Sequence, residues 1–254
     1  MKQIRFIMAM CLFVGCTLGL KGQTKVIAHR GFWDTEGSAQ NSIVALKKAA
    51  AAKVYGSEFD VQLSADGVVV VNHDNAIGGY VIADTPYKTL KKLKLKNGEP
   101  LPTLRNYLKV GKKCPNMQLV LEIKPHKTKE QEEQITRKVV EMVRALELGS
   151  QVEYISFSLY VCELLANLTP QSEIAYLGGN LAPELLKEKG LTGIDYKYSV
   201  LYKHPDWIEQ AHRLGMKVNA WTVDGDNDMR KLIEMNVDYL TTNKPLRALE
   251  LVKE

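Results

Sequence analysis

The sequence predicts a closed (β/α)8 barrel, the TIM-barrel form of the α/β class, built as a single domain. Eight short apolar runs of the kind that form buried strands alternate with amphipathic helical patterns. A chain of 254 residues with 45% hydrophobic and 25% charged residues can bury one large core. No glycine-rich G-x-G-x-x-G motif follows any of the strand-like runs, which disfavours a dinucleotide-binding sheet.

The elements follow one another in a regular order. We expect strands at residues 25–29, 56–61, 118–123, 153–157, 173–177, 192–196, 216–222 and 238–242. The helical patterns span residues 42–54, 129–147, 159–168, 182–189, 205–214, 226–235 and 245–252. Gly149, Gly190 and Gly215 follow three of these patterns, where a glycine commonly ends a helix. Eight parallel strands are the number that closes this kind of barrel.

A small β-hairpin is expected as an excursion after the second strand. Residues 68–72 form another apolar run, and only residues 64–67 separate it from the strand before it. Asp66-Gly67 in that gap is a dipeptide that favours a tight turn between antiparallel strands. We expect the hairpin to lie at the top of the barrel and to bring His73 to the active face.

The first residues read as a leader rather than as part of the fold. Lys2 and Arg5 precede an apolar run over residues 6–20, which is the pattern of a signal peptide. The run is short for a membrane-spanning helix, which needs about 20 apolar residues. We therefore expect residues 1–22 to be a signal peptide or lipoprotein leader, and residues 23–254 to form the barrel domain. An N-terminal anchor helix that is never cleaved is the alternative.

The mode of cleavage stays open between two forms. Phe13-Val14-Gly15-Cys16 is similar to a bacterial lipobox, in which the cysteine is lipidated and begins the mature chain. Ordinary cleavage near Gly22 is the alternative. The expected location is therefore outside the cytoplasm of a bacterium, as a periplasmic protein or as a lipoprotein anchored to the membrane through Cys16.

The charge balance disfavours a nucleic-acid partner. The formal net charge of +5 includes three basic residues of the leader, and the remaining 31 basic and 29 acidic residues give +2. A nucleic-acid-binding domain would need a strongly basic face. The basic residues do gather in one segment, where they predict either a solvated helix face or a contact with anionic lipid headgroups. They are Lys88, Lys91, Lys92, Lys94 and Lys96.

Carboxylates follow the alternation of two predicted strands. Glu58 and Asp60 project to one side of their strand, as Glu122 and Lys124 do of theirs. In a (β/α)8 barrel the active site lies at the carboxyl ends of the strands, so we expect these groups to converge there. Three converging carboxylates repel one another unless a cation lies between them. An all-oxygen ligand set suits Mg²⁺ or Ca²⁺.

Two histidines and two basic residues complete the expected site. His29 ends the first strand and His73 follows the hairpin, and imidazoles supply an acid and a base near neutral pH. Arg30 and Lys124 add positive charge where an anion would bind. Together these groups indicate metal-assisted phosphoryl chemistry.

With these motifs the chain resembles the glycerophosphodiester phosphodiesterase family. The resemblance begins at about residue 25 and rests on His29-Arg30-Gly31, Glu58-x-Asp60, His73-Asp74, Leu121-Glu122-Ile123-Lys124 and Trp221-Thr222-Val223-Asp224. It implies a (β/α)8 barrel that hydrolyses glycerophosphodiesters, as small-molecule substrates, to glycerol 3-phosphate and an alcohol with one divalent cation. By the same resemblance, the metal ligands are Glu58, Asp60 and Glu122, the acid–base pair is His29 and His73, and the phosphate contacts are Arg30 and Lys124.

Two further residues have two interpretations each. Trp221 is either an aromatic at the edge of the core or a wall for the glycerol moiety. Asn41 either contacts the substrate or caps the helix that begins near residue 42.

The chain departs from the family pattern at two positions. Members usually have Pro-Glu-Asn where this chain has Ala39-Gln40-Asn41, and Thr-Asp-x-Pro where it has Thr242-Asn243-Lys244-Pro245. Two alternative functions follow. One is phospholipase D-like cleavage of lysophospholipids, which keeps the barrel and the metal. The other is an exported, non-catalytic phosphodiester-binding protein, which Gln40 and Asn243 make conceivable.

Overall fold

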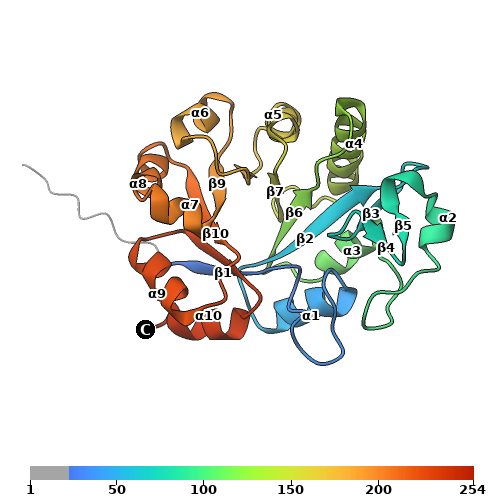
Figure 1. Ribbon diagram of the computed structural model, residues 1–254, viewed down its shortest axis with the longest axis horizontal. Helices are drawn as coiled ribbons and strands as arrows, with labels where there is room; N and C mark the ends of the chain where they lie inside the picture. Colours follow the sequence, from blue (N-terminus) through green and yellow to red (C-terminus); the bar gives the residue numbers. More distant parts are fainter. Residues whose placement is uncertain (1–22) are drawn as a thin grey trace, which may run out of the picture.

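In a computed structural model, which describes residues 23–254, the chain forms a closed barrel of eight parallel strands (Figure 1). Its strands are β1 (Lys25–Ala28), β2 (Gly56–Leu63), β6 (Gln118–Ile123), β7 (Val152–Ser156), β8 (Ile174–Tyr176), β9 (Gly193–Lys197), β10 (Lys217–Trp221) and β11 (Tyr239–Thr242). Strand β1 closes the barrel by pairing in parallel with β11 on one side and with β2 on the other. The predicted fold and all eight predicted strands are confirmed.

Helices surround the barrel on all sides (Figure 1). The seven predicted helices are α1 (Ile43–Ala51), α4 (Lys129–Ala145), α5 (Leu159–Leu168), α6 (Pro183–Glu188), α8 (Asp206–Arg213), α9 (Asp226–Glu234) and α10 (Pro245–Leu251). Their apolar faces and the outward side chains of the strands form one large buried core. No helix within residues 23–254 combines the length and the apolar character needed to cross a membrane.

Two of the three glycines that were predicted to end helices do so. Gly190 (φ +82°) and Gly215 (φ +69°) take up the left-handed conformation just beyond α6 and α8. The prediction for Gly149 was wrong. Helix α4 ends earlier, and Glu147 adopts the left-handed conformation with φ 57°.

The hairpin after the second strand is confirmed, and it is the start of a larger excursion. Strand β3 (Val69–Val71) pairs antiparallel with the end of β2. A second hairpin of β4 (Ala76–Ile77) and β5 (Tyr80–Val81) follows, then a 3-10 turn (Ile82–Asp84) and helix α2 (Tyr87–Leu90). A small separate core of Val70, Ile82, Leu90 and Leu101 holds these pieces together.

Within residues 23–254, three helices lie outside the predicted ranges. The first is the short α2, and of the five clustered lysines only Lys88 lies on it, so the predicted helix face over residues 88–96 was wrong. Helix α3 (Leu104–Gly111) begins at the Thr103 cap and buries Leu104, Tyr107 and Leu108 on one face. That three- and four-residue spacing is a helical signal that the sequence does contain. Helix α7 (Tyr198–Lys203) is too short for its periodicity to stand out from the strand before it.

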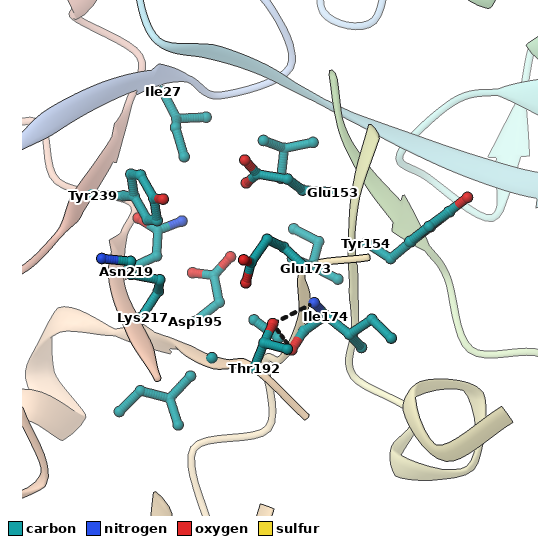
Figure 2. Close-up of a pocket in the computed structure, with 15 residues that line it drawn as sticks. Ile27, Glu153, Tyr154, Glu173, Ile174, Thr192, Asp195, Lys217, Asn219 and Tyr239 are labelled. Carbon is teal, nitrogen blue, oxygen red and sulfur yellow. Dashed lines mark hydrogen bonds between the residues drawn. The ribbon is translucent and has the colours of Figure 1, made fainter. Parts of the chain in front are cut away.

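The interior of the barrel holds a polar cluster below the active face (Figure 2). Asp195 of β9 is buried there, and its Oδ1 has no hydrogen-bond partner. Burial raises the pKa of Asp195 to about 7. The folded protein therefore keeps a proton that the unfolded chain loses near pH 4.

The buried Asp195 carboxyl predicts a pH-dependent stability. Since its folded pKa is raised, the folded state loses stability as the pH rises from about 4 to about 7. Asp195→Asn should remove this loss and raise the free energy of unfolding at pH 8 by up to about 4 kcal/mol. Thermal denaturation of both proteins between pH 4 and 8 measures the difference. An equal pH dependence in wild type and variant would contradict the assignment.

Candidate active site

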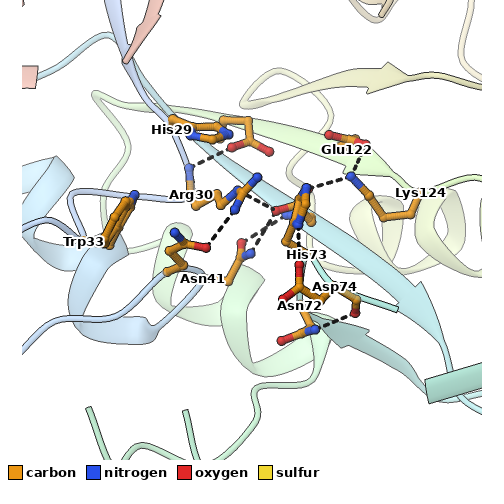
Figure 3. A network of polar contacts seen from close by, with 12 residues as sticks. His29, Arg30, Trp33, Asn41, Asn72, His73, Asp74, Glu122 and Lys124 are labelled. Atoms are coloured by element: carbon orange, nitrogen blue, oxygen red, sulfur yellow. Dashed lines mark hydrogen bonds and ion pairs between the residues drawn. The ribbon is translucent and has the colours of Figure 1, made fainter. Parts of the chain in front are cut away.

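Three carboxylates converge at the active face (Figure 3). Glu58 and Asp60 lie on β2, and Glu122 lies beside Asp60 on the paired strand β6. They are 3%, 1% and 7% exposed, and their ligand atoms lie within 4.8 Å of one another. The predicted end of β2, at residue 61, just after Asp60, was two residues too early. Strand β2 continues to Leu63 because its last residues pair with β3.

Burial and mutual repulsion act strongly on this triad. Burial, then Asp60 and Glu122, raise the pKa of Glu58 well above its ordinary value. Burial and Asp60 raise the pKa of Glu122 to about 8. Burial also opposes the charge of Asp60, but Lys124, His73 and Asn41 outweigh it and lower its pKa. The Oε1 atom of Glu58 has no hydrogen-bond partner. A buried oxygen cluster with an unpartnered carboxylate oxygen fits a hard divalent cation.

Two cationic side chains flank Asp60. The Nζ atom of Lys124 lies 3.3 Å from Oδ1 of Asp60 and 2.8 Å from Oε1 of Glu122. The Nε atom of Arg30 lies 3.8 Å from Oδ2 of Asp60. Burial lowers the pKa of Lys124, but Asp60 and Glu122 outweigh it, so the net pKa is raised and the ammonium stays charged. Lys124 and Arg30 both border the cavity above the triad, where an anion could reach them.

Asn41 lies against Asp60. Its Nδ2 donates to Oδ2 of Asp60 at 2.8 Å, and its Oδ1 accepts from the backbone N–H of Asp60 at 3.1 Å. Asn41 is buried and adopts a φ of 61°. The cap of α1 is Ser42, whose side chain accepts from the N–H of Ala45. The amide of Asn41 thus fixes the orientation of the Asp60 carboxylate.

A chain of hydrogen bonds sets the tautomer of His29. Asn243 donates from Nδ2 to Oδ2 of Asp224 at 2.7 Å, which turns its Oδ1 toward His29. Trp33 Nε1 donates to the same Oδ1 at 2.9 Å, and His29 Nδ1 lies 2.9 Å from it. Nδ1 therefore carries the proton, and Nε2 keeps a free lone pair. Burial, then the charge of Arg30, lower the pKa of His29 to about 4, so the ring is neutral at pH 7.

His73 lies on a loop whose backbone carbonyls accept hydrogen bonds from one side chain, that of Gln62. The Nδ1 atom of His73 lies 2.8 Å from Oδ1 of Asp74. The Nε2 atom of Gln62 donates to the backbone carbonyls of Asn72, His73 and Asp74 at 3.1, 3.0 and 2.6 Å. Gln62 continues the alternation of Glu58 and Asp60 along β2, and this spacing is the signal by which the sequence could have identified it.

One hollow lies above the triad, and a second lies beside the loops that carry Gln40 and His73. The first has a volume of about 290 Å³, contains both histidines on its wall and is bounded on one side by Phe157, Leu177 and Trp221. Trp221 donates from Nε1 to the carbonyl of Asp195 at 2.9 Å and meets Phe157 edge to face. The second hollow, of about 680 Å³, runs between residues 33–40 and the β4–β5 excursion and passes Asn72 and Asp74. A phosphodiester carries two substituents on one phosphate, and each substituent could occupy one of the two hollows.

The structure thus gathers every predicted site residue at one face of the barrel. The sequence did not identify Gln62, Trp33 or the link from Asp224 through Asn243 to His29 as parts of the site. Asp224 does end the Trp221-Thr222-Val223-Asp224 motif, which was the signal for it.

Comparisons with known proteins agree on one family. Residues 29–247 match the model of the glycerophosphoryl diester phosphodiesterase family. A glycerophosphodiester phosphodiesterase structure from Parabacteroides distasonis is 49% identical, with 92% of this chain and 98% of that chain covered and a TM-score of 0.91. A glycerophosphodiester phosphodiesterase from Caldanaerobacter subterraneus subsp. tengcongensis is 28% identical, with 91% of this chain and 99% of the relative covered.

A phosphodiesterase from Oleispira antarctica was solved with the product sn-glycerol-3-phosphate. It is 23% identical over 91% of this chain and 98% of that chain, with a TM-score of 0.78, and it shares the fold. The family match spans most of the barrel and includes all the carboxylates and histidines described above. The chain therefore belongs to the glycerophosphoryl diester phosphodiesterase family, whose members are phosphoric diester hydrolases.

Proposed function

We propose that this protein hydrolyses glycerophosphodiesters to glycerol 3-phosphate and an alcohol, with one divalent cation, Mg²⁺ or Ca²⁺. The observation that carries the proposal is the buried triad of Glu58, Asp60 and Glu122, with an unpartnered oxygen on Glu58, beside two histidines. Membership of the family supplies the reaction class.

The triad would hold the cation, because its three carboxylates supply oxygen ligands on one side only and leave the cavity side open. The chemistry that a cation held there would supply is polarisation of a phosphoryl oxygen, which would make the phosphorus more electrophilic. Asn41 then acts as a positioning residue, since its amide fixes the carboxylate of Asp60.

Arg30 and Lys124 would bind the non-bridging oxygens of the phosphate. Both border the cavity, and each is already close to Asp60. In the transition state the phosphoryl oxygens gain negative charge, which fixed cations in a water-poor site stabilise. The guanidinium is held in place because its Nη1 donates to Oε1 of Gln40 at 2.7 Å.

We assign the general base to His29 and the general acid to His73. The neutral ring of His29 has a free Nε2, which would take the proton of the attacking hydroxyl. His73 pairs with the carboxylate of Asp74, a better partner for a positively charged imidazole than the neutral amide of Asn243. His73 would give its proton to the departing alkoxide as the P–O bond breaks. The attacking hydroxyl belongs either to water or to the glycerol itself, which would form a cyclic phosphate first.

The two hollows would take the two substituents of the phosphodiester. The glycerol would lie against Trp221 and Phe157 in the smaller one. The alcohol headgroup would extend into the larger one, past Trp33 and Asp74.

The raised pKa of Glu122 predicts that cation binding depends on pH. Below about pH 8 the cation-free protein keeps a proton on Glu122, and a bound cation must displace it. For each proton displaced, the affinity should rise about tenfold per pH unit between pH 6 and 8. Titration calorimetry with Mg²⁺ and Ca²⁺, in buffers of different ionisation enthalpy, counts the released protons. An affinity that does not change with pH would contradict a carboxylate site.

We also propose export of the protein. The leader, residues 1–22, lies outside the described residues, so its charged start, its apolar run and Cys16 remain a prediction from the sequence. Mass spectrometry of the mature protein from its host would separate lipidation of Cys16 from cleavage near Gly22.

One substrate comparison tests the proposed function against its alternatives. Headgroup release is measured in parallel from glycerophosphocholine and from lysophosphatidylcholine. Faster turnover of glycerophosphocholine supports the proposal, whereas turnover of the lysolipid alone would favour the phospholipase D-like alternative. Binding of both without turnover of either would favour a non-catalytic binding protein.

A further inference from the structure

Five lysines of the excursion form one exposed, unpaired surface, which we call the lysine surface: Lys88, Lys91, Lys92, Lys94 and Lys96. No acidic residue occurs between Asp84 and Glu99. Within residues 23–254, none of the five lies within 4.0 Å of a carboxylate oxygen, while many other exposed lysines and arginines do pair. These five side chains therefore form no ion pair in the described part of the fold, while Asp34 and Glu36 line the larger hollow together with Lys94 and Lys96.

The leucines between these lysines explain why all five point outward. Leu90 is buried in the small core with Ile82, and Leu93 and Leu95 pack against the same core. The lysines occupy the remaining positions of this segment, so burial of the leucines leaves them on the outside. The small core thus holds the lysine surface in a fixed shape.

An exposed apolar tip lies beside the lysines. Tyr80 and Val81 of β5 are 46% and 42% exposed, although both are large and apolar. A Cβ atom added at Gly78, in the turn of the same hairpin, would lie 3.2 Å from Cδ2 of Leu93. The β4–β5 hairpin therefore packs directly on the lysine segment, and both lie at one corner of the molecule (Figure 1).

We propose that the lysine surface and the Tyr80–Val81 tip dock this protein onto an anionic phospholipid bilayer. Lysines near a membrane are attracted by its negative surface potential, and aromatic and aliphatic side chains enter the headgroup region. A face that served solubility alone would need the lysines but not an exposed Tyr80 and Val81. A nucleic acid would also use the lysines, but it would gain little from an aliphatic tip.

Docking in this orientation has a consequence for the active site. The larger hollow is lined on one side by Ile77, Lys94 and Leu95 of the excursion, and it passes the loop that carries His73. Its opening would then lie close to the lipid surface, where molecules derived from phospholipids are released. Docking itself does not depend on catalysis, so an inactive protein would dock too.

Sedimentation with vesicles tests the proposal. The protein used is residues 23–254, which contain the complete barrel, because the apolar leader would bind vesicles by itself. In about 0.1 M salt, we expect binding to vesicles with about 30% phosphatidylglycerol and little binding to pure phosphatidylcholine. Lys88→Gln, Lys91→Gln and Lys92→Gln combined should weaken the partition roughly 100-fold, since each lysine contributes about fivefold.

A matched variant removes the same charge elsewhere. Lys109, Lys113 and Lys187 are also exposed and unpaired among the described residues, so their combined change to Gln should leave vesicle binding within about threefold of wild type. Tyr80→Ser with Val81→Ser should reduce the binding that survives in about 0.5 M salt, where charge is screened. Equal losses in the two lysine variants, or binding to a DNA duplex but not to anionic vesicles, would overturn the proposal.

Discussion

Replacing either His29 or His73 by alanine is expected to lower kcat for glycerophosphodiester hydrolysis by roughly 10²–10⁴-fold. Without the free Nε2 of His29, the attacking hydroxyl keeps its proton. Without His73, the alkoxide leaves unprotonated. Cation binding should stay close to wild type in both variants, since neither side chain belongs to the carboxylate triad. Steady-state release of glycerol 3-phosphate, together with cation titration, measures the two effects separately.

The control for both variants is His204→Ala. His204 is exposed, stacks on Trp207 and lies outside the cavity. Its removal should leave kcat within about twofold of wild type. Turnover close to wild type in both His29→Ala and His73→Ala would refute the assigned acid–base pair.

Glu58→Gln should change activity and stability in opposite directions. The substitution removes one ligand of the cation site, so we expect turnover to fall by more than about 10²-fold. It also removes a buried carboxyl group whose pKa is raised by burial and by the charges of Asp60 and Glu122, so that its ionisation opposes folding. The cation-free variant should therefore be more stable than the cation-free wild type at pH 8, by roughly 1–3 kcal/mol. Denaturant unfolding in EDTA, with and without added Mg²⁺ or Ca²⁺, measures both quantities.

Glu184→Gln is the matched control, because Glu184 is exposed on α6 and far along the chain from the triad. It should change neither turnover nor stability beyond about 0.5 kcal/mol. A Glu58→Gln protein that still gains stability from the cation as wild type does would show that the ion binds elsewhere.

The barrel and the β2–β3 hairpin were predictable from the sequence, whereas the rest of the excursion was not. Each barrel strand is a short apolar run next to a helical pattern, and eight such pairs leave few other folds. Strands β4 and β5 have two residues each, so they show no alternation that could be detected. Their position depends on contacts such as Gly78 with Leu93, which follow from tertiary packing alone.

The convergence of the charged groups was predictable from the sequence, whereas the hydrogen bonds that support them needed the structure. The convergence of Glu58, Asp60 and Glu122 follows from strand alternation and from the active face of a barrel. The two departures from the family pattern turn out to be hydrogen-bond acceptors of site residues. Gln40 accepts from Arg30, and Asn243 accepts from His29. Arg30 and Gln40 meet within the irregular loop between β1 and α1, which follows no spacing rule. His29 and Asn243 meet only because β1 pairs with β11.

Asn243, which replaces the aspartate of the usual family motif, affects the protonation of His29. An amide oxygen orients His29 without the negative charge of an aspartate, so it stabilises a positively charged ring less. This agrees with a His29 ring that is neutral at pH 7 and available as a base.

Hydrolysis of glycerophosphodiesters that depends on a cation held by Glu58, Asp60 and Glu122 can be measured directly. Glycerol 3-phosphate release is measured from glycerophosphocholine, glycerophosphoethanolamine and glycerophosphoinositol with residues 23–254 in EDTA, Mg²⁺ or Ca²⁺. We expect turnover that EDTA abolishes and that at least one of the two cations restores. Release that continues undiminished in EDTA, or no release with either cation, would contradict this expectation.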